Sequence, residues 1–514
     1  MTLPTLARAL LPSLRGREDL VVPAPEVLDL PEKVVQFGTG ALLRGLIEPA
    51  IDEANERGEL GGRIVMVGQT GSGRDRAINR QDGLYTLVTR GLVDGEPRTQ
   101  RRVISSVSRA LSAAEEWDAV LALARQPELR MVFSNTTEAG LALDERDQLE
   151  DAPPRSFPGK LTRFLWERAR AFDFSDASYL FVFPTELVEE NGEVLRERVR
   201  TQALRWKLGA HFLEMVEETS FHGTLVDRIV PGTPAPDEHA HEEATLGYRD
   251  ALLTVAEPYS LFVIEGDTGA ALSLPFQNIP GNGVDVRVLG DAAPFRERKL
   301  RLLNGTHTAM VPVALLAGCE TVRDAMEDAQ VGRFIRRIAL DEIAPFVEAP
   351  DAAAFAREVL DRFANPFIRH AVSDIVLQQT MKLRVRVVPS ILDYARQTGH
   401  VPASLAFAFA AWLRFARGDL QRAREAAGRP LPRDDQGGRV RALWKEVGND
   451  VITLARRACA DTGLWDADLS AVPGFADAVA SSLARVMEVG ARAALGEHLA
   501  RVEAQASTMA GSGG

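Results

Sequence analysis

The 514-residue sequence predicts an α/β N-terminal domain with a doubly wound, mostly parallel sheet, followed by a mostly α-helical C-terminal domain. Two observations support this fold class. Up to about residue 183, short apolar runs alternate with segments of helical periodicity, which is typical of parallel α/β sheets. Beyond about residue 290, Ala, Leu, Arg and Glu dominate, and apolar residues recur at helical spacing over long segments. We therefore place the two domains at residues 1–290 and 291–514.

The first domain opens, after a leader of about 30 residues, with a buried strand at 33–37 and a tight turn at Gly38-Thr39-Gly40. A strand, a glycine turn and a helix form the opening unit of a Rossmann-like fold. A hairpin between 84–89 and 101–107 is predicted from the turn residues Asp94-Gly95. The remaining strands are predicted at 63–68, 131–134 and 179–183, and the helices at 41–55, 113–125 and 159–172.

The second domain is predicted to be helical from three long periodic segments, 325–343, 352–363 and 475–504. No repeat of the solenoid kind is present in the sequence. Residues 504–514 are small and polar, which favours a frayed tail.

Composition limits the partners of this protein. With 60 Lys and Arg against 72 Asp and Glu, the net charge is −12, which argues against binding to nucleic acid or to an anionic membrane. The two cysteines, Cys319 and Cys459, exclude a disulfide framework and a thiolate zinc site, and they favour a reducing compartment. The longest apolar stretch, 401–413, is shorter than the ~18 residues of a transmembrane helix, and the N-terminus lacks a signal-peptide pattern. We therefore expect a cytoplasmic protein that acts on a small molecule, with its oligomeric state left open.

The turn at Gly38 and Gly40 is the first candidate site. Between a strand and a helix, such glycines let backbone N–H groups approach the pyrophosphate of a dinucleotide. The third glycine of the usual fingerprint is absent, because position 43 is Leu, so an ordinary β–α turn is the alternative. The loop after the second strand, 69–74, contains no acidic residue to bind an adenosine ribose. Its polar residues suit NAD, and Arg74 suits the 2′-phosphate of NADP, so both cofactors remain open.

The second candidate site is the segment that contains Lys299, Asn304 and His307. On an ideal α-helix these three positions fall within about 140° of one another, and therefore on one side. In a desolvated site a lysine can exchange a proton with a carbinol or ketone oxygen, and an amide N–H can stabilise that oxygen as charge develops. The alternative is a solvated lysine beside an asparagine and a histidine that cap or pack locally.

Polar loops after predicted strands are further candidates, because open α/β sheets bind ligands at the carboxyl ends of their strands. The loop that begins with Asn135 and Thr136 is also compatible with a helix N-cap, and the loop with Glu186 with a plain strand exit. Asp227 and Arg228 are equally compatible with a structural ion pair. His239 and His241 lie in a Pro-rich acidic segment, which we predict to be a solvated loop rather than a metal site.

Together these motifs resemble the long-chain polyol-specific dehydrogenase (mannitol dehydrogenase) family, which includes mannitol dehydrogenase, fructuronate reductase and tagaturonate reductase. The resemblance covers roughly residues 33–390 and is closer to the uronate-reducing branch. It rests on the set Lys299, Asn304 and His307, on Arg44, and on the segments 37–40, 70–74, 81–86, 134–140, 156–162, 183–187 and 226–229.

The resemblance implies a nicotinamide cofactor, NAD with NADP not excluded, and no metal. It implies that Lys299 is the general acid/base and that Asn304 and His307 bind the reacting oxygen and its neighbour. By the same resemblance, the cofactor contacts are assigned to Phe37, Gly38, Gly40, Arg44, Thr70, Asn135 and Thr136. The substrate contacts include Glu186, Asp227, Arg228 and Lys382.

Two positions depart from the family pattern. Thr185-Glu186 stands where mannitol dehydrogenases carry Asp-Asn, which favours the uronate branch. Gly223, preceded by His222, stands where the family usually has Asn before Thr-Leu-Val-Asp-Arg. The first departure leaves a second oxyanion donor unidentified, and the second removes a polar contact unless His222 supplies it.

A uronate carries a carboxylate, and a chain of net charge −12 needs a local cation to bind it. Arg296, one helical turn before Lys299, and Lys382, which matches a substrate-binding lysine of the polyol enzymes, are the candidates. Lys382 lies in a run with Arg384 and Arg386. The alternative is that Arg296 and the cations of 382–386 are solvated or paired with acids such as Glu297 and Asp374.

The function that the resemblance implies is the interconversion of a keto-uronate, D-tagaturonate, and an aldonate, D-altronate, by hydride transfer. Mannitol–fructose or fructuronate–mannonate oxidoreduction is the alternative within the family. A non-catalytic, ligand-sensing relative is the alternative of another class. The presence of Lys299, Asn304 and His307 favours an enzyme, because a sensor needs no proton donor.

Overall fold

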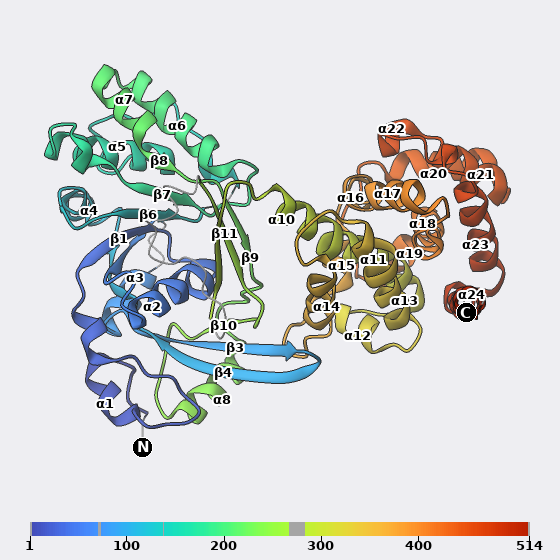
Figure 1. The fold of residues 1–514 in the computed structure, drawn as a ribbon, viewed down its shortest axis with the longest axis horizontal. Helices are drawn as coiled ribbons and strands as arrows, with labels where there is room; N and C mark the ends of the chain where they lie inside the picture. The colour runs from blue at the N-terminus through green and yellow to red at the C-terminus, as the bar shows by residue number, and fades with distance from the viewer. Residues whose placement is uncertain (1–2, 70–72, 137, 267–282, 512–514) are drawn as a thin grey trace. The chain divides into compact units, whose positions relative to one another are not determined.

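The computed structural model describes residues 3–69, 73–136, 138–266 and 283–511. The chain divides into two compact units (Figure 1). The first comprises Met1–Arg90 and Pro97–Ala292, and the second comprises Gly91–Glu96 and Ala293–Gly514.

The first unit is built around a six-stranded parallel sheet in the order β5-β2-β1-β6-β7-β8. The chain fills one side of β1 first and then returns to fill the other side, so the predicted doubly wound topology is confirmed. The strands are β1 (Glu32–Phe37), β2 (Arg63–Gly68), β5 (Val107–Ser112), β6 (Met131–Ser134), β7 (Phe181–Pro184) and β8 (Ser220–Phe221).

Both faces of this sheet are buried, which explains why its strands are continuous apolar runs. Val34 of β1 packs in a cluster with Ile51 of helix α2, whereas Val35 and Phe37 pack with the helices of the other face. Figure 1 shows α5, α6 and α7 together beside β7 and β8. The helices of this unit are α1 (Leu11–Leu14), α2 (Glu48–Glu56), α3 (Arg74–Arg80), α4 (Trp117–Ala124), α5 (Phe157–Ala171), α6 (Asn191–Arg205), α7 (Ala210–Glu218) and α8 (Pro236–Leu246).

Two three-stranded sheets, β10-β3-β4 and β12-β11-β9, complete the first unit. The predicted hairpin is present, and its turn residues Asp94 and Gly95 both have positive φ, at 53° and 78°. The strands are β3 (Tyr85–Val93), β4 (Glu96–Ile104), β9 (Thr224–Asp227), β10 (Thr254–Ala256), β11 (Leu261–Glu265) and β12 (Asp285–Leu289).

The sequence-based assignment of 101–107 as a single hairpin arm is wrong. β4 ends at Ile104, and β5 begins a new strand of the main sheet at Val107. The chain leaves the hairpin at Ser105, whose backbone N–H and side-chain hydroxyl both donate to the buried Asp52 carboxylate at 2.7 and 2.8 Å. This interaction replaces the ladder bonds that would continue β4.

The predicted loop around His239 and His241 is also wrong, because these residues lie in helix α8. Pro236 occupies the first helical turn, and the Asp237 and Glu238 carboxylates interact favourably with the positive N-terminal end of the helix dipole. Gly247 ends the helix, with φ 79°. His239 Nε2 lies 2.8 Å from the Asp250 carbonyl oxygen, which holds it within the fold.

From Ala293 onward, every named element of the second unit is helical within the described residues. Its helices are α10 (Ala293–Arg298), α11 (Thr306–Ala317), α12 (Val322–Glu327), α13 (Val331–Arg337), α14 (Ala352–Phe363), α15 (Val372–Ile375), α16 (Gln379–Arg386), α17 (Val388–Thr398), α18 (Ala403–Ala416), α19 (Asp419–Ala426), α20 (Gly437–Val447), α21 (Val451–Cys459), α22 (Thr462–Trp465), α23 (Phe475–Val489) and α24 (Ala491–Gly511).

Two of the three predicted long helices are interrupted, whereas α14 matches its prediction. The segment 325–343 breaks because the Asp328 carboxylate accepts from the backbone N–H groups of Gln330 and Val331 and starts α13. The segment 475–504 breaks at Gly490, which has φ 84° and ψ 160°. The apolar stretch 401–413 contributes most of α18, which is buried along almost its whole length, as expected for an all-apolar helix at the centre of a domain.

Helix α2 buries a carboxylate against the face of the main sheet. Glu48 has no exposed surface, and its Oε1 accepts a 2.9 Å hydrogen bond from Gln36 Nε2. The same Gln36 amide donates to the Gly38 carbonyl oxygen at 3.0 Å. Burial raises the pKa of Glu48 to about 7, even though Arg44 and Gln36 favour its charged form.

We expect the first unit to lose stability as the pH rises through this range. The unfolded chain releases the Glu48 proton near pH 4.5 and the folded chain near pH 7, so the free energy of unfolding falls by up to about 3 kcal/mol between these values. Glu48→Gln keeps the acceptor for Gln36 and removes the charge. Urea unfolding should show the variant close to the parent at about pH 5 and more stable at about pH 8.

The exposed Glu128 provides the control. The difference in the free energy of unfolding between Glu128→Gln and the parent should be the same at both pH values. A stability difference between Glu48→Gln and the parent that does not change with pH would contradict the buried, proton-binding role of Glu48.

Candidate active site

The turn after β1 lies where the main sheet reverses its strand order. Gly38 N–H donates to the Val67 carbonyl oxygen of β2 at 3.0 Å, and Asn135 N–H donates to the Phe37 carbonyl oxygen at 3.2 Å. Gly38 has φ 128°, and a Cβ added there would lie 3.0 Å from the Asn135 carbonyl oxygen. Glycine is therefore required at position 38 for both the backbone conformation and the close approach of the loop after β6.

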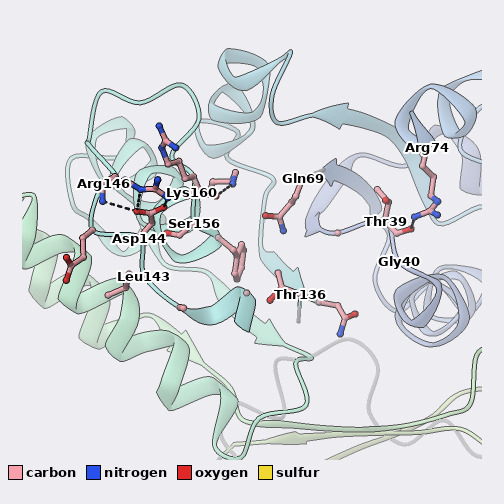
Figure 2. A pocket seen from close by; sticks show the side chains of 17 residues that line it. Thr39, Gly40, Gln69, Arg74, Thr136, Leu143, Asp144, Arg146, Ser156 and Lys160 are labelled. Carbon is pink, nitrogen blue, oxygen red and sulfur yellow. Dashed lines mark hydrogen bonds and ion pairs between the residues drawn. The ribbon is translucent and has the colours of Figure 1, made fainter. Parts of the chain in front are cut away.

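Gly40 has a different role, because it borders open space. A Cβ at this position would meet only Asn135 Oδ1, at 4.0 Å. Gly40 lines a cavity of about 1010 Å³ at the carboxyl ends of β1, β2 and β6. Figure 2 shows Gln69, Thr136 and Ser156 around this cavity, with Arg74 bonded to the Thr39 carbonyl oxygen. The lining residues include Gly38, Thr39, Gly40, Gln69, Arg74, Asn135, Thr136, Arg155, Ser156 and Lys160.

The loop after β6 is held by the residues that follow β7. Asn135 Nδ2 donates to the Thr185 carbonyl oxygen at 2.9 Å, and Thr136 N–H donates to Glu186 Oε1 at 2.9 Å. Glu186 is 2% exposed, and its second oxygen accepts from Ser134 Oγ at 3.1 Å. Burial raises the pKa of the Glu186 carboxyl. These contacts make Glu186 a support for the cavity-lining loop in this structure, whereas Asn135 and Thr136 line the cavity itself.

Three other predicted site residues lie in the interior of the first unit. Phe37 packs against the Phe157 and Phe164 rings, at centroid distances of 5.5 and 5.8 Å. Arg44 donates to Thr254 Oγ1 at 3.0 Å and to the Thr39 carbonyl oxygen at 2.9 Å. Arg228 donates to the Gly45 and Glu257 carbonyl oxygens at 2.6 and 2.9 Å. Both arginines thus brace the backbone around the glycine turn.

Two predicted positions remain to be placed. Asp227 is 4% exposed at the end of β9, opposite Leu261 of β11. Thr70 lies outside the described residues.

Gly223 makes room for a neighbouring carboxylate. A Cβ at Gly223 would lie 2.0 Å from Glu265 Oε2. Any larger residue at position 223 would therefore require the Glu265 side chain to move. The preceding His222 is stacked on the Phe183 ring at 5.1 Å, and its Nδ1 lies 2.8 Å from the Glu265 carbonyl oxygen. His222 is thus engaged within the fold.

In the second unit, a π-helical segment, Lys299–Gly305, carries two of the three predicted catalytic residues. Hydrogen bonds of a π-helix join residues five apart, so Lys299 and Asn304 lie one turn from each other on the same side. An ideal α-helix would place them farther apart around the axis. Lys299 and Asn304 are half-buried, and the α-helix α11 continues directly from this segment and carries His307.

His307 is 8% exposed and stacks on the Phe363 ring of α14 at 3.8 Å between centroids, with the His370 ring 5.2 Å away. Burial and the neighbouring cations hold the pKa of His307 well below its usual range, so the imidazole is neutral near pH 7. Its Nε2 has no hydrogen-bond partner among the described residues. A neutral imidazole with a vacant nitrogen is suited to hydrogen-bond a hydroxyl group.

Three cationic side chains and the His370 imidazole, whose pKa burial lowers, lie close to His307. Arg362, His370, Lys382 and Arg386 each disfavour its protonation. Lys382 Nζ donates to the Ile375 carbonyl oxygen at 2.8 Å, and burial lowers the pKa of this lysine. Arg296 lies on α10, one turn before the π-helical segment.

From the sequence, Lys382 and the run of cations at 382–386 were candidates, whereas Arg362 and His370 were not, and Arg386 had no role of its own. Lys382 and Arg386 are four residues apart, which places them on one side of a helix, and this spacing could have identified Arg386 from the sequence.

In the described part of the chain, no group of three or more His, Cys, Asp or Glu side chains is arranged to hold a metal ion. Within the same residues, no helix is both long and apolar enough to cross a membrane.

Comparison with known proteins shows the class first: the chain is an oxidoreductase that acts on a CH–OH group. Residues 32–275 match the mannitol dehydrogenase Rossmann domain, and residues 291–487 match the mannitol dehydrogenase C-terminal domain. The chain belongs to the mannitol dehydrogenase family, and it is a polyol or sugar-acid dehydrogenase.

Curated relatives match nearly the whole chain. An altronate oxidoreductase of Bacillus subtilis (strain 168) is 40% identical over 91% of this chain and 95% of its own length. An altronate oxidoreductase of Yersinia pestis is 42% identical over 90% of this chain and 96% of its own length.

Solved structures share the fold at lower identity. The Pseudomonas fluorescens mannitol 2-dehydrogenase ternary complex with NAD and D-mannitol has a TM-score of 0.64 at 22% identity, and the match covers 97% of this chain and 99% of that one. A substrate-free D-sorbitol dehydrogenase has a TM-score of 0.76 at 23% identity, covering 96% and 100%. These two likenesses support the fold assignment.

Proposed function

We propose that this protein interconverts D-tagaturonate and D-altronate with NAD as the hydride carrier. The observation that carries the proposal is the 40–42% identity, over about nine-tenths of the chain, to proteins named altronate oxidoreductase. In this proposal residues 1–290 bind the cofactor, and residues 291–514 carry the catalytic and substrate-binding side chains. NADP is not excluded as a second cofactor.

The cavity next to the glycine turn fits a dinucleotide. A side chain at Gly40 would project into space that is open in this structure, and the cavity of about 1010 Å³ is large enough for a cofactor of this size. Gly38, Gly40, Asn135 and Thr136 would hold it through backbone and side-chain polar groups at the strand ends. When bound, a nicotinamide dinucleotide supplies or takes up a hydride.

The side chains of the second unit supply the proton chemistry. During reduction, the Lys299 ammonium would give a proton to the carbonyl oxygen, and during oxidation the amine would take it back. The Asn304 amide, one π-helical turn from Lys299, would donate a hydrogen bond to the same oxygen and stabilise its developing charge. The neutral His307 would bind an adjacent hydroxyl and so orient the carbon chain.

The decisive experiment measures NADH oxidation with D-tagaturonate, D-fructuronate and D-fructose under identical conditions. The proposal expects the highest kcat/KM for D-tagaturonate. A higher value for D-fructuronate or D-fructose would assign the protein to another activity of the same family. Absence of NADH oxidation with all three, in a protein that binds NADH, would contradict the proposed reaction.

Lys299→Ala should reduce kcat by about 10²–10⁴-fold while the dissociation constant of NADH stays unchanged, because the variant loses a general acid but no cofactor contact. Steady-state kinetics and fluorescence titration with NADH measure the two quantities. The exposed Lys445, also in the second unit, gives a matched control, because Lys445→Ala should keep full activity. Turnover within a few-fold of the parent for Lys299→Ala would contradict the assignment.

Gly40→Val should weaken NADH binding without unfolding the protein, because the new side chain would occupy part of the cavity in which the dinucleotide is proposed to bind. Gly38 is unsuitable for this test, since its φ of 128° makes any other residue strained. Gly290 is the matched control, because a Cβ there meets nothing within 4 Å. Unchanged NADH affinity in a folded Gly40→Val variant would place the nucleotide elsewhere.

A further inference from the structure

Helix α16 presents two cations to the helix that carries the proposed catalytic residues. Lys382 and Arg386 are four residues apart and therefore share one side of α16. α16 packs against both the π-helical segment Lys299–Gly305 and α11, and Figure 1 shows α11, α14, α15 and α16 in one group. The approach is close, because a Cβ at Gly305 would lie 2.9 Å from the Arg386 carbonyl oxygen.

Arg386 makes few interactions with the protein. Its Nη1 lies 3.5 Å from Thr308 Oγ1, at the limit of a hydrogen bond, and its buried Nε has no partner among the described residues. Neither Arg386 nor Lys382 forms an ion pair with any carboxylate of the described chain. By contrast Arg384, on the same helix, pairs with Asp466 at 3.4 Å.

The surroundings of Arg386 add positive charge rather than neutralise it. Arg362, Lys382 and Arg386 lie near His307. Burial lowers the pKa of the neighbouring His370, against the opposite effect of Asp374. Burial lowers the pKa of Arg386, and burial together with Arg386 lowers that of Lys382. Lys382 and Arg386 share one side of α16 and have no carboxylate paired to them among the described residues, so a bound anion would compensate their mutual repulsion.

The chemistry of this cluster suits a carboxylate. A guanidinium group offers two parallel N–H donors to a planar carboxylate, and Lys382 adds a point charge one turn away. In a keto-uronate the carboxylate and the carbonyl that is reduced are separate groups of one carbon chain. The carboxylate thus needs a binding group apart from Lys299 and Asn304, and Arg386 packs beside Gly305 and Thr308, farther along the same helix.

We propose that Arg386 binds the substrate carboxylate and thereby determines specificity for keto-uronates over uncharged ketoses, with Lys382 assisting. This inference rests on the proposed function. It assigns the carboxylate contact to a residue of α16, and Arg296 of α10 becomes the competing candidate in the test.

The experiment compares Arg386→Met, Arg384→Met and Arg296→Met with the parent enzyme, using D-tagaturonate and D-fructose with NADH. Methionine keeps the apolar stem of each arginine and removes its charge. For Arg386→Met, kcat/KM for D-tagaturonate should fall by about 30-fold or more, the loss typical of a buried charge pair that loses one partner. The value for D-fructose should change by less than about 3-fold, and Arg384→Met should match the parent on both substrates.

A binding measurement makes the test independent of turnover of an uncharged ketose. The dissociation constant of D-altronate, measured by calorimetry, should rise by about 30-fold or more in Arg386→Met and by less in Arg386→Lys, which keeps the charge but loses the fork. Equal losses on charged and uncharged substrates, or altronate binding within about 3-fold of the parent, would overturn the inference. A selective loss in Arg296→Met instead would transfer the role to α10.

The failure of this inference differs from failure of the proposed function. If the parent reduces D-tagaturonate and Arg386→Met does so equally well, the carboxylate contact is wrong and the function stands. If the parent neither reduces D-tagaturonate nor binds D-altronate, the proposed function fails and this inference fails with it.

Discussion

The close approach of the chain at the ends of β1 and β6 is the constraint on which the cavity of the first unit depends. Gly38 reaches φ 128° and leaves only 3.0 Å between a hypothetical Cβ and the Asn135 carbonyl oxygen, so no other residue type fits there without strain. This approach brings Gly40, Asn135 and Thr136 to one cavity. Gly38 therefore shapes the cavity through the backbone, whereas Gly40 keeps it open.

Polar side chains inside the first unit hold that turn in place. The Gln36 amide connects the Gly38 carbonyl oxygen to the buried Glu48. Arg44 donates to the Thr39 carbonyl oxygen within the turn, and Arg228 donates to that of Gly45 in the following helical segment. A buried polar group is stable only when its hydrogen bonds are made, so these contacts fix the turn in one geometry. Arg44 and Arg228 were predicted from motifs to contact ligands. In this structure neither lines the cavity, and both donate hydrogen bonds to oxygens of the first unit.

The doubly wound fold, β2 and β6 could be predicted from the sequence, because continuous apolar runs between helical segments identify strands that are buried on both faces. The short strands β8 and β10 could not, since two or three residues are too few to show alternation. The π-helical geometry at Lys299 was likewise hidden, because apolar periodicity near 3.6 does not reveal a local change in hydrogen bonding. Arg386 was not assigned a role of its own because ion pairing is a tertiary property: the sequence shows three cations at 382, 384 and 386, and only the fold shows that Arg384 has Asp466 as a partner.

The charge distribution of the second unit links these observations to selectivity. An overall charge of −12 repels an anionic substrate at long range, but this field is screened within about 10 Å at moderate ionic strength. At contact distance the local groups dominate, and around His307 these are the buried Arg362 of α14 and the half-buried Lys382 and Arg386 of α16. Burial and the same cations hold the pKa of His307 well below its usual range, so its imidazole is neutral. In the proposed function it binds a hydroxyl group, and Arg386 and Lys382 bind the carboxylate. One cluster thus separates recognition of the hydroxyl groups from recognition of the carboxylate, which is the distinction between a polyol substrate and a sugar-acid substrate.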